Sequence, residues 1–193
     1  MNALEFIHLN NIVHMDLKPA NIIVTDRLVL KLTDFGCSVK INSSSTASVD
    51  TNNNYEETNI KNSYVNSRWT AGTWFYRAPE LFRNDLQSNN NSNVTTSCDI
   101  YSLGICMWQL LTREFPYNGE NPHVIIYQIV SKGLRPEYPQ GVNKEDGDSV
   151  FTKNHIEFEQ VYRLIVEKSW DSDPNRRFTA KHIKHLLTNK FVC

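Results

Sequence analysis

The stretch "HMDLKPAN" at residues 14–21, followed by "DFG" at residues 34–36, decides how this sequence is interpreted. It sets four polar residues at fixed offsets: Asp16, Lys18, Asn21 and Asp34. Asp16 can accept a proton from an incoming hydroxyl group, and Lys18 can place a positive charge near the same reacting centre. Asn21 and Asp34 offer the oxygen atoms that bind hard cations such as Mg²⁺. This combination is what a phosphoryl transfer needs.

Short β-prone segments surround these residues. Residues 12–14, 21–24 and 28–32 favour strands, and residues 25–27 favour a turn between the last two. Gly36 lets the loop after Asp34 turn sharply. We therefore expect a small hairpin system around the candidate site.

The remainder is mostly helical in pattern. Residues 3–11 resemble the end of an amphipathic helix with Asn11 as a left-handed cap. The predicted helices are residues 99–112, 121–133, 158–170 and 179–187, with Asn121 and Thr179 as N-caps and Gly133 ending the second helix. The first is apolar on nearly every side, which is typical of a buried helix. The fold class is therefore mainly α with a small β-hairpin system (α+β).

Two polar tracts interrupt this pattern. Residues 43–66 are dense in Asn, Ser and Thr, and we expect them to be disordered because they cannot bury enough apolar surface. Residues 84–97 have the same character.

Composition excludes several classes of protein. The net charge of −1 argues against nucleic-acid binding and against a polybasic membrane adaptor. The four cysteines show no CxxC spacing, so we expect free thiols in a reducing compartment and no zinc site. No amino-terminal signal pattern and no membrane-spanning run occur in the sequence. These features favour the cytoplasm.

The sequence resembles the eukaryotic protein kinase family. "HMDLKPAN", "DFG" and "APE" (residues 78–80) match the order and spacing of its motifs, and "DIYSLG" (99–104) and "DPNRRFT" (173–179) extend the match. By this resemblance, residues 14–21 are a catalytic loop and residues 34–80 an activation segment with an insert at 43–66. Residues 81–193 are then a helical subdomain with an insert at 84–97.

The resemblance implies a role for individual residues. Asp16 would be the catalytic base, Lys18 would contact the transferring phosphate, and Thr73 would contact the catalytic loop. Asn21 and Asp34 would bind Mg²⁺ and, through it, ATP. The residues expected to support the site structurally are His14, Phe35, Gly36, Glu80, Asp99 and Arg177. Among these, Asp99 would anchor the catalytic-loop backbone, and Arg177 would pair with Glu80.

Lys18 and Thr73 are typical of the serine/threonine branch. Within it, "DFGCS" (34–38) and "TREFPYNGE" (112–120) are most similar to the Mos proto-oncogene kinases. That similarity implies an activator of a MAP kinase cascade in oocyte meiosis, with a MAP kinase kinase as one candidate protein substrate. Met15 stands where many kinases have an Arg that pairs with a phosphate on the activation segment. We therefore expect that this pairing does not switch the protein on.

The sequence contains no glycine-rich phosphate loop and no V-A-I-K type segment. By resemblance these belong to a preceding lobe, so we expect this chain to be a carboxy-terminal kinase lobe whose ATP-gripping lobe is absent. Two interpretations stay open. In the first, the chain is part of an active serine/threonine kinase. In the second, it is a non-catalytic binding or regulatory module built from a kinase lobe. The four intact polar residues favour the kinase.

Overall fold

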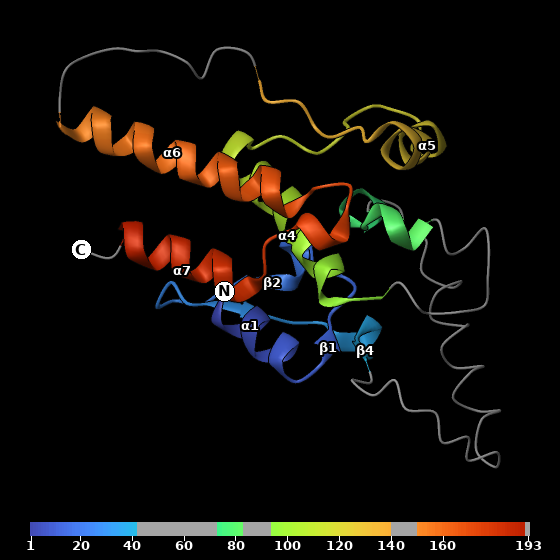
Figure 1. Ribbon diagram of the computed structural model, residues 1–193, viewed down its shortest axis with the longest axis horizontal. Coiled ribbons are helices and arrows are strands. Elements are labelled where there is room, and N and C mark those ends of the chain that lie inside the picture. Colours follow the sequence, from blue (N-terminus) through green and yellow to red (C-terminus); the bar gives the residue numbers. More distant parts are fainter. Residues whose placement is uncertain (42–72, 83–93, 140–149, 192–193) are drawn as a thin grey trace.

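The computed structural model describes residues 1–41, 73–82, 94–139 and 150–191 of the chain (Figure 1). Its helices are α1 (Asn2–Leu9), α4 (Thr96–Thr112), α5 (Pro122–Lys132), α6 (Val150–Ser169) and α7 (Ala180–Phe191). Its strands are β1 (Ile12–Val13), β2 (Ile22–Val24), β3 (Leu30–Leu32) and β4 (Val39–Lys40). The expected mainly helical fold with a small β system is confirmed.

The strands form two small antiparallel sheets. β2 pairs with β3 in the register Ile22 to Leu32, and β1 pairs with β4. The β2–β3 hairpin was expected, but β3 is shorter than the predicted run of residues 28–32 because Leu28 adopts a left-handed φ of 56°. The backbone N–H of Leu28 donates to Thr25 O (2.8 Å), which closes the turn. β4 was not predicted.

Helix α4 is the centre of the molecule. It packs against α6 and β1, and α6 and α7 lie beside it in Figure 1. Its residues from Cys98 to Trp108 are buried except Leu103, as the apolar pattern predicted. The carboxy-terminal turn is different, because Leu110 is 65% exposed.

Two apolar clusters hold the helices together. The main cluster joins α1, β1, α4, α6 and α7 and includes Leu4, Val13, Ile105, Ile165 and Ile183. A second cluster packs α5 against residues 73–82 through Trp74, Phe82, Ile125 and Ile129. Among the described residues, no helix is long and apolar enough to cross a membrane.

Several predicted boundaries were wrong. Helix α4 begins at Thr96, so the last two residues of the polar tract 84–97 are helical; the Ser97 carbonyl accepts Arg177 Nη1 at 2.9 Å, a tertiary contact that composition does not reveal. Helix α6 begins at residue 150 and not 158, and α7 continues to residue 191 and not 187. The expected disorder of residues 43–66 lies outside the described residues.

The predicted helix caps are confirmed. Asn121 caps α5, its side chain accepting the N–H of His123 at 3.0 Å, and Gly133 ends that helix at φ 67°. Thr179 Oγ1 accepts the N–H of His182 at 3.1 Å at the start of α7. Asn11, after α1, has the expected positive φ of 57°.

Candidate active site

The β2–β3 hairpin brings the two expected metal ligands to the same place. Asn21 ends the short 3₁₀ helix η1 (Pro19–Asn21) and directly precedes β2, while Thr33 and Asp34 directly follow β3. The carbonyl of Asn21 accepts both the N–H of Thr33 (2.9 Å) and Thr33 Oγ1 (3.1 Å). These hydrogen bonds between the ends of the two strands bring Asn21 and Asp34 close together, although the two residues lie apart in the sequence.

Asp16 is a buried carboxylate whose two oxygens differ. Oδ2 accepts Lys18 Nζ at 2.9 Å and Asn21 Nδ2 at 3.0 Å. Oδ1 is buried and has no hydrogen-bond partner in the part of the chain that the structure describes. A buried carboxylate oxygen is costly to leave unpaired. The unpaired Oδ1 therefore fits an atom kept for a substrate hydroxyl.

Asn21 is held with its amide nitrogen toward Asp16. Nδ2 donates to both the backbone carbonyl and Oδ2 of Asp16, at 2.8 and 3.0 Å. This assignment leaves the amide oxygen as the group that could bind a cation.

Asp34 adopts a left-handed conformation at the start of the next turn. Its φ and ψ are 59° and 70°, and its carboxylate accepts the N–H of Gly36 at 3.3 Å. The Asp34 side chain is exposed, and with Asn21 it offers the oxygen donors that Mg²⁺ prefers. The described residues contain no cluster of three or more His, Cys, Asp and Glu side chains suited to a metal. The donor set therefore fits an ion that takes its remaining ligands from phosphates and water.

His14 links the predicted catalytic loop (residues 14–21) to the turn after β3. It is fully buried, its Nδ1 accepts the N–H of Asp16 at 3.3 Å, and its Nε2 lies 2.9 Å from the carbonyl of Thr33. These bonds assign the ring proton to Nε2. The ring also packs edge-on against Phe35, with centroids 4.9 Å apart. His14 therefore orients the loop and does not face the reacting centre.

Asp99 supports the same loop from α4. It is fully buried; Oδ2 accepts the N–H of His14 at 2.8 Å and Oδ1 accepts the N–H of Met15 at 2.9 Å. His8 Nε2 also lies 2.9 Å from Oδ2. The sequence did not single out His8, and its separation from Asp99 along the chain offers no signal.

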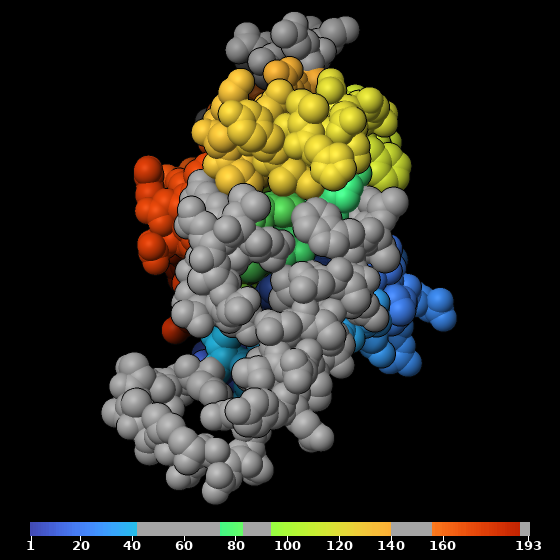
Figure 2. Space-filling view, turned by 90° about the vertical axis from the view of Figure 1, so that its right-hand side faces the viewer, coloured from blue at the N-terminus to red at the C-terminus, as the bar shows by residue number. Residues whose placement is uncertain are grey.

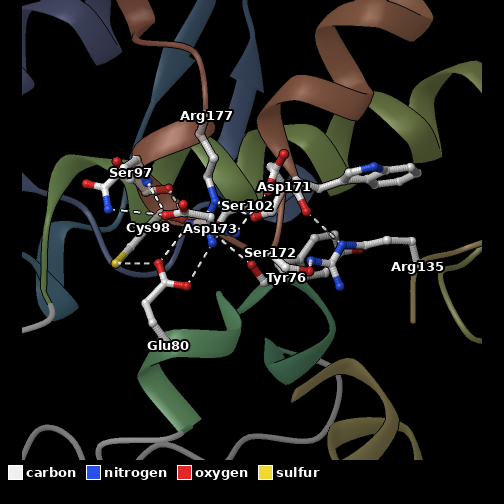
Figure 3. A network of polar contacts seen from close by, with 12 residues as sticks. Tyr76, Glu80, Ser97, Cys98, Ser102, Arg135, Asp171, Ser172, Asp173 and Arg177 are labelled. Atoms are coloured by element: carbon white, nitrogen blue, oxygen red, sulfur yellow. Dashed lines mark hydrogen bonds and ion pairs between the residues drawn. The ribbon is translucent and has the colours of Figure 1, made fainter. Parts of the chain in front are cut away.

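Glu80 and Arg177 form a buried ion pair. Arg177 Nη1 lies 2.7 Å from Glu80 Oε1, and Nη2 lies 2.8 Å from Oε2 (Figure 3). Cys98 Sγ lies 3.4 Å from Glu80 Oε1. Burial, with the Glu80 charge as a second cause, raises the pKa of the Cys98 thiol to about 12. The thiol therefore stays neutral and acts as a hydrogen-bond donor.

Thr73 is the expected site residue that the structure does not locate fully. It begins the 3₁₀ helix η3 (Thr73–Tyr76), but its side chain lies outside the described atoms. The structure thus brings together Asp16, Lys18, Asn21 and Asp34 with His14 and Asp99 behind them. Glu80 and Arg177 form a separate group.

Comparisons with known proteins agree with this geometry. The protein kinase domain model matches residues 1–191. The serine/threonine-protein kinase mos of Patiria pectinifera is 38% identical over 154 residues, which are 79% of this chain and 38% of that protein. The proto-oncogene serine/threonine-protein kinase mos of Mus musculus is 35% identical over 187 residues, covering 97% of this chain and 45% of its own length. The chain thus spans less than half of these relatives.

Proposed function

Because the chain belongs to the protein kinase family, we propose that it carries the catalytic residues of a serine/threonine protein kinase that transfers the γ-phosphate of ATP to protein hydroxyl groups. The observation that supports this proposal most directly is the geometry of Asp16. One of its oxygens is fixed by Lys18 and Asn21, and the other is buried with no hydrogen-bond partner among the residues that the structure describes. Its relatives named above are serine/threonine kinases, which supports this branch.

The residues of the site divide the work. Asp16 Oδ1 accepts the proton of the substrate hydroxyl, and the fixed Oδ2 keeps the carboxylate in one orientation. Lys18 supplies positive charge beside that oxygen and can move from Asp16 to a phosphoryl oxygen. Asn21 and Asp34 would hold Mg²⁺, which when bound neutralises charge on the phosphates of ATP.

Replacing Asp16 tests the proposal. Asp16→Asn removes the proton acceptor and keeps the shape, so kcat should fall about 100- to 10,000-fold, the usual contribution of general base catalysis. The assay is transfer of radiolabelled phosphate from ATP to a protein substrate. Asp26→Asn is the matched control, because Asp26 is exposed in the turn between β2 and β3. Equal loss in both variants would sink the proposal.

Binding of Mg-ATP separates the kinase from a non-catalytic module. We expect isothermal titration of the 193-residue chain with Mg-ATP to show binding that weakens without Mg²⁺ and in Asp34→Ala. Absence of metal-dependent binding, together with absence of transfer, would favour a binding or regulatory module.

The proposal extends to the cellular role. Similarity to the Mos kinases supports an activator of a MAP kinase cascade in oocyte meiosis, acting in the cytoplasm on a MAP kinase kinase. Incubation with a recombinant MAP kinase kinase tests the substrate, with phosphorylation of that protein expected for the unmodified protein and not for Asp16→Asn. Phosphate transfer to generic substrates alone would overturn this extension and leave the kinase proposal standing.

A further inference from the structure

Arg135 lies in the segment between α5 and α6 and contacts two backbone carbonyls and one side-chain hydroxyl. Its Nε donates to the Trp170 carbonyl at 2.7 Å and its Nη1 to the Leu134 carbonyl at 2.7 Å. Its Nη2 donates to Ser172 Oγ at 3.1 Å (Figure 3). The guanidinium thus joins the end of α5 to the turn that follows α6.

Arg177 makes a parallel set of contacts from the other side. Its Nε donates to the carbonyl of Asp171, the residue next to Trp170, at 2.8 Å. Carbonyls at the carboxy-terminal end of a helix lack intrahelical donors and favour nearby positive charge. The two arginines therefore satisfy successive carbonyls after α6.

A buried aromatic ring lies against both arginines. The Tyr101 side chain of α4 is completely buried, and its ring centroid lies 5.0 Å from Arg135 Cζ and 5.1 Å from Arg177 Cζ. Cation–π contacts of this kind are stronger when they are desolvated. Displacement of Arg135 would therefore change the packing of the ring on which Arg177 rests.

Two sets of contacts connect Arg135, Arg177 and Tyr101 to η3 and the residues that follow it. On one side, Arg177 holds Glu80, and Ser102, next to Tyr101, donates to the Tyr76 carbonyl at 2.8 Å. On the other side, the Leu134 carbonyl that accepts Arg135 also accepts Tyr117 Oη at 3.4 Å, and the Tyr117 ring stacks on Phe75 with centroids 6.1 Å apart.

Under the proposed function, η3 and α5 are the elements expected to meet the protein substrate. Figure 2 shows α5 (yellow) bordering residues 73–82 (green) on one face of the molecule. We infer that Arg135 is a positioning residue that fixes η3 and α5 relative to each other and so sets the affinity for the protein substrate. The substrate part of this inference rests on the proposed function; the positional part does not.

Hydrogen exchange on the full 193-residue chain tests the positional part. In Arg135→Met, amides of residues 73–82 and 128–134 should exchange about five- to thirtyfold faster, while those of α4 and of residues 160–169 should not change. Arg135→Lys keeps the charge but loses the planar guanidinium group. Its exchange rates at these residues should therefore lie between those of the unmodified protein and those of Arg135→Met. Arg176→Met is the matched control, because Arg176 is an exposed arginine of the 3₁₀ helix η4 (Pro174–Arg176), and its ion pair with Asp171 spans 3.6 Å.

The ring has its own pair of variants. Tyr101→Phe keeps the aromatic face and should leave exchange at residues 73–82 unchanged, whereas Tyr101→Leu should reproduce the effect of Arg135→Met. Faster exchange confined to residues 133–136 and 170–173 would overturn the inference. Uniform acceleration across the helices in both Arg135 variants would also overturn it, since Arg135 would then be a general stability residue.

Kinetics complete the test. In Arg135→Lys the KM for the protein substrate should rise at least about fivefold, with the KM for ATP and kcat unchanged. An equal fall in kcat with an unchanged protein KM would contradict the substrate part. If the unmodified protein transferred no phosphate, the proposed function would fail while the exchange result still decided the positional part.

Discussion

At the residue scale, the buried carboxylate of Asp99 has a demanding role. It accepts two backbone N–H groups of the predicted catalytic loop, from His14 and Met15. Asp99→Asn leaves a single acceptor oxygen, so at least one buried N–H group loses its partner. We expect the free energy of unfolding to fall by about 1–3 kcal/mol, measured by urea denaturation.

Asp26→Asn is the comparison for this change, because Asp26 is exposed in the β2–β3 turn. It should alter the unfolding midpoint by much less. An Asp99→Asn midpoint equal to that of the unmodified protein would show that the loop does not depend on these bonds.

Met15 gives a second prediction at this scale. Its backbone has a φ of 68°, and its half-buried side chain packs against the main apolar cluster. A thioether cannot bind a phosphate by charged hydrogen bonds. Replacing every Ser and Thr of residues 43–70 with Ala should therefore leave phosphate transfer within about twofold of normal, measured with radiolabelled ATP. Loss of activity in that variant would overturn the prediction, provided that its far-ultraviolet circular dichroism is unchanged.

At the scale of elements, the contact between α4 and α6 depends on Gly104. A Cβ atom there would lie 2.9 Å from Ser169 Cβ, 3.2 Å from Trp170 N and 3.3 Å from Val166 O. Two of these three are backbone atoms, so the helices must separate. Gly104→Ala should destabilise the fold by about 1–3 kcal/mol, although Ala favours helix formation over Gly by about 1 kcal/mol. Urea denaturation measures the change.

A second substitution separates the steric cause from others. Ser169→Gly removes the nearest of the three contacts, so the double variant should recover part of the lost stability. Purely additive losses would show that the Ser169 contact is not responsible.

At the scale of the whole molecule, buried and half-buried tyrosines should make the fold less stable at alkaline pH. Burial raises the pKa of Tyr76, Tyr138 and Tyr162 to about 12 in each case, against an ordinary value near 10. The unfolded chain therefore ionises first. Stability should be complete below about pH 10 and should decline as the pH rises from 10 to 12.

Urea midpoints between pH 9 and pH 12 test this expectation. The double variant Tyr138→Phe with Tyr162→Phe should decline less steeply than the unmodified protein, because two of the titrating groups are gone. Equal slopes would show that other groups govern the alkaline transition.

The sequence by itself determined the fold class and the helix caps, and it predicted the residues of the candidate site. Asn121, Gly133 and Thr179 mark helix ends because capping is a local interaction between neighbouring residues. Asp16, Lys18, Asn21 and Asp34 stand within one short stretch, so their spacing carries the chemistry directly. The apolar pattern of residues 99–112 is also a local feature, so the sequence predicted that helix.

Only the tertiary structure decided the contacts that join distant segments. The pairing of His8 with Asp99, the strand β4, the helical turn at residues 96–98 and the contacts of Arg135 with Tyr101 and Trp170 have no local pattern. Each depends on side chains that meet only after the helices pack, because burial makes such bonds strong and determines which donors and acceptors remain to be satisfied.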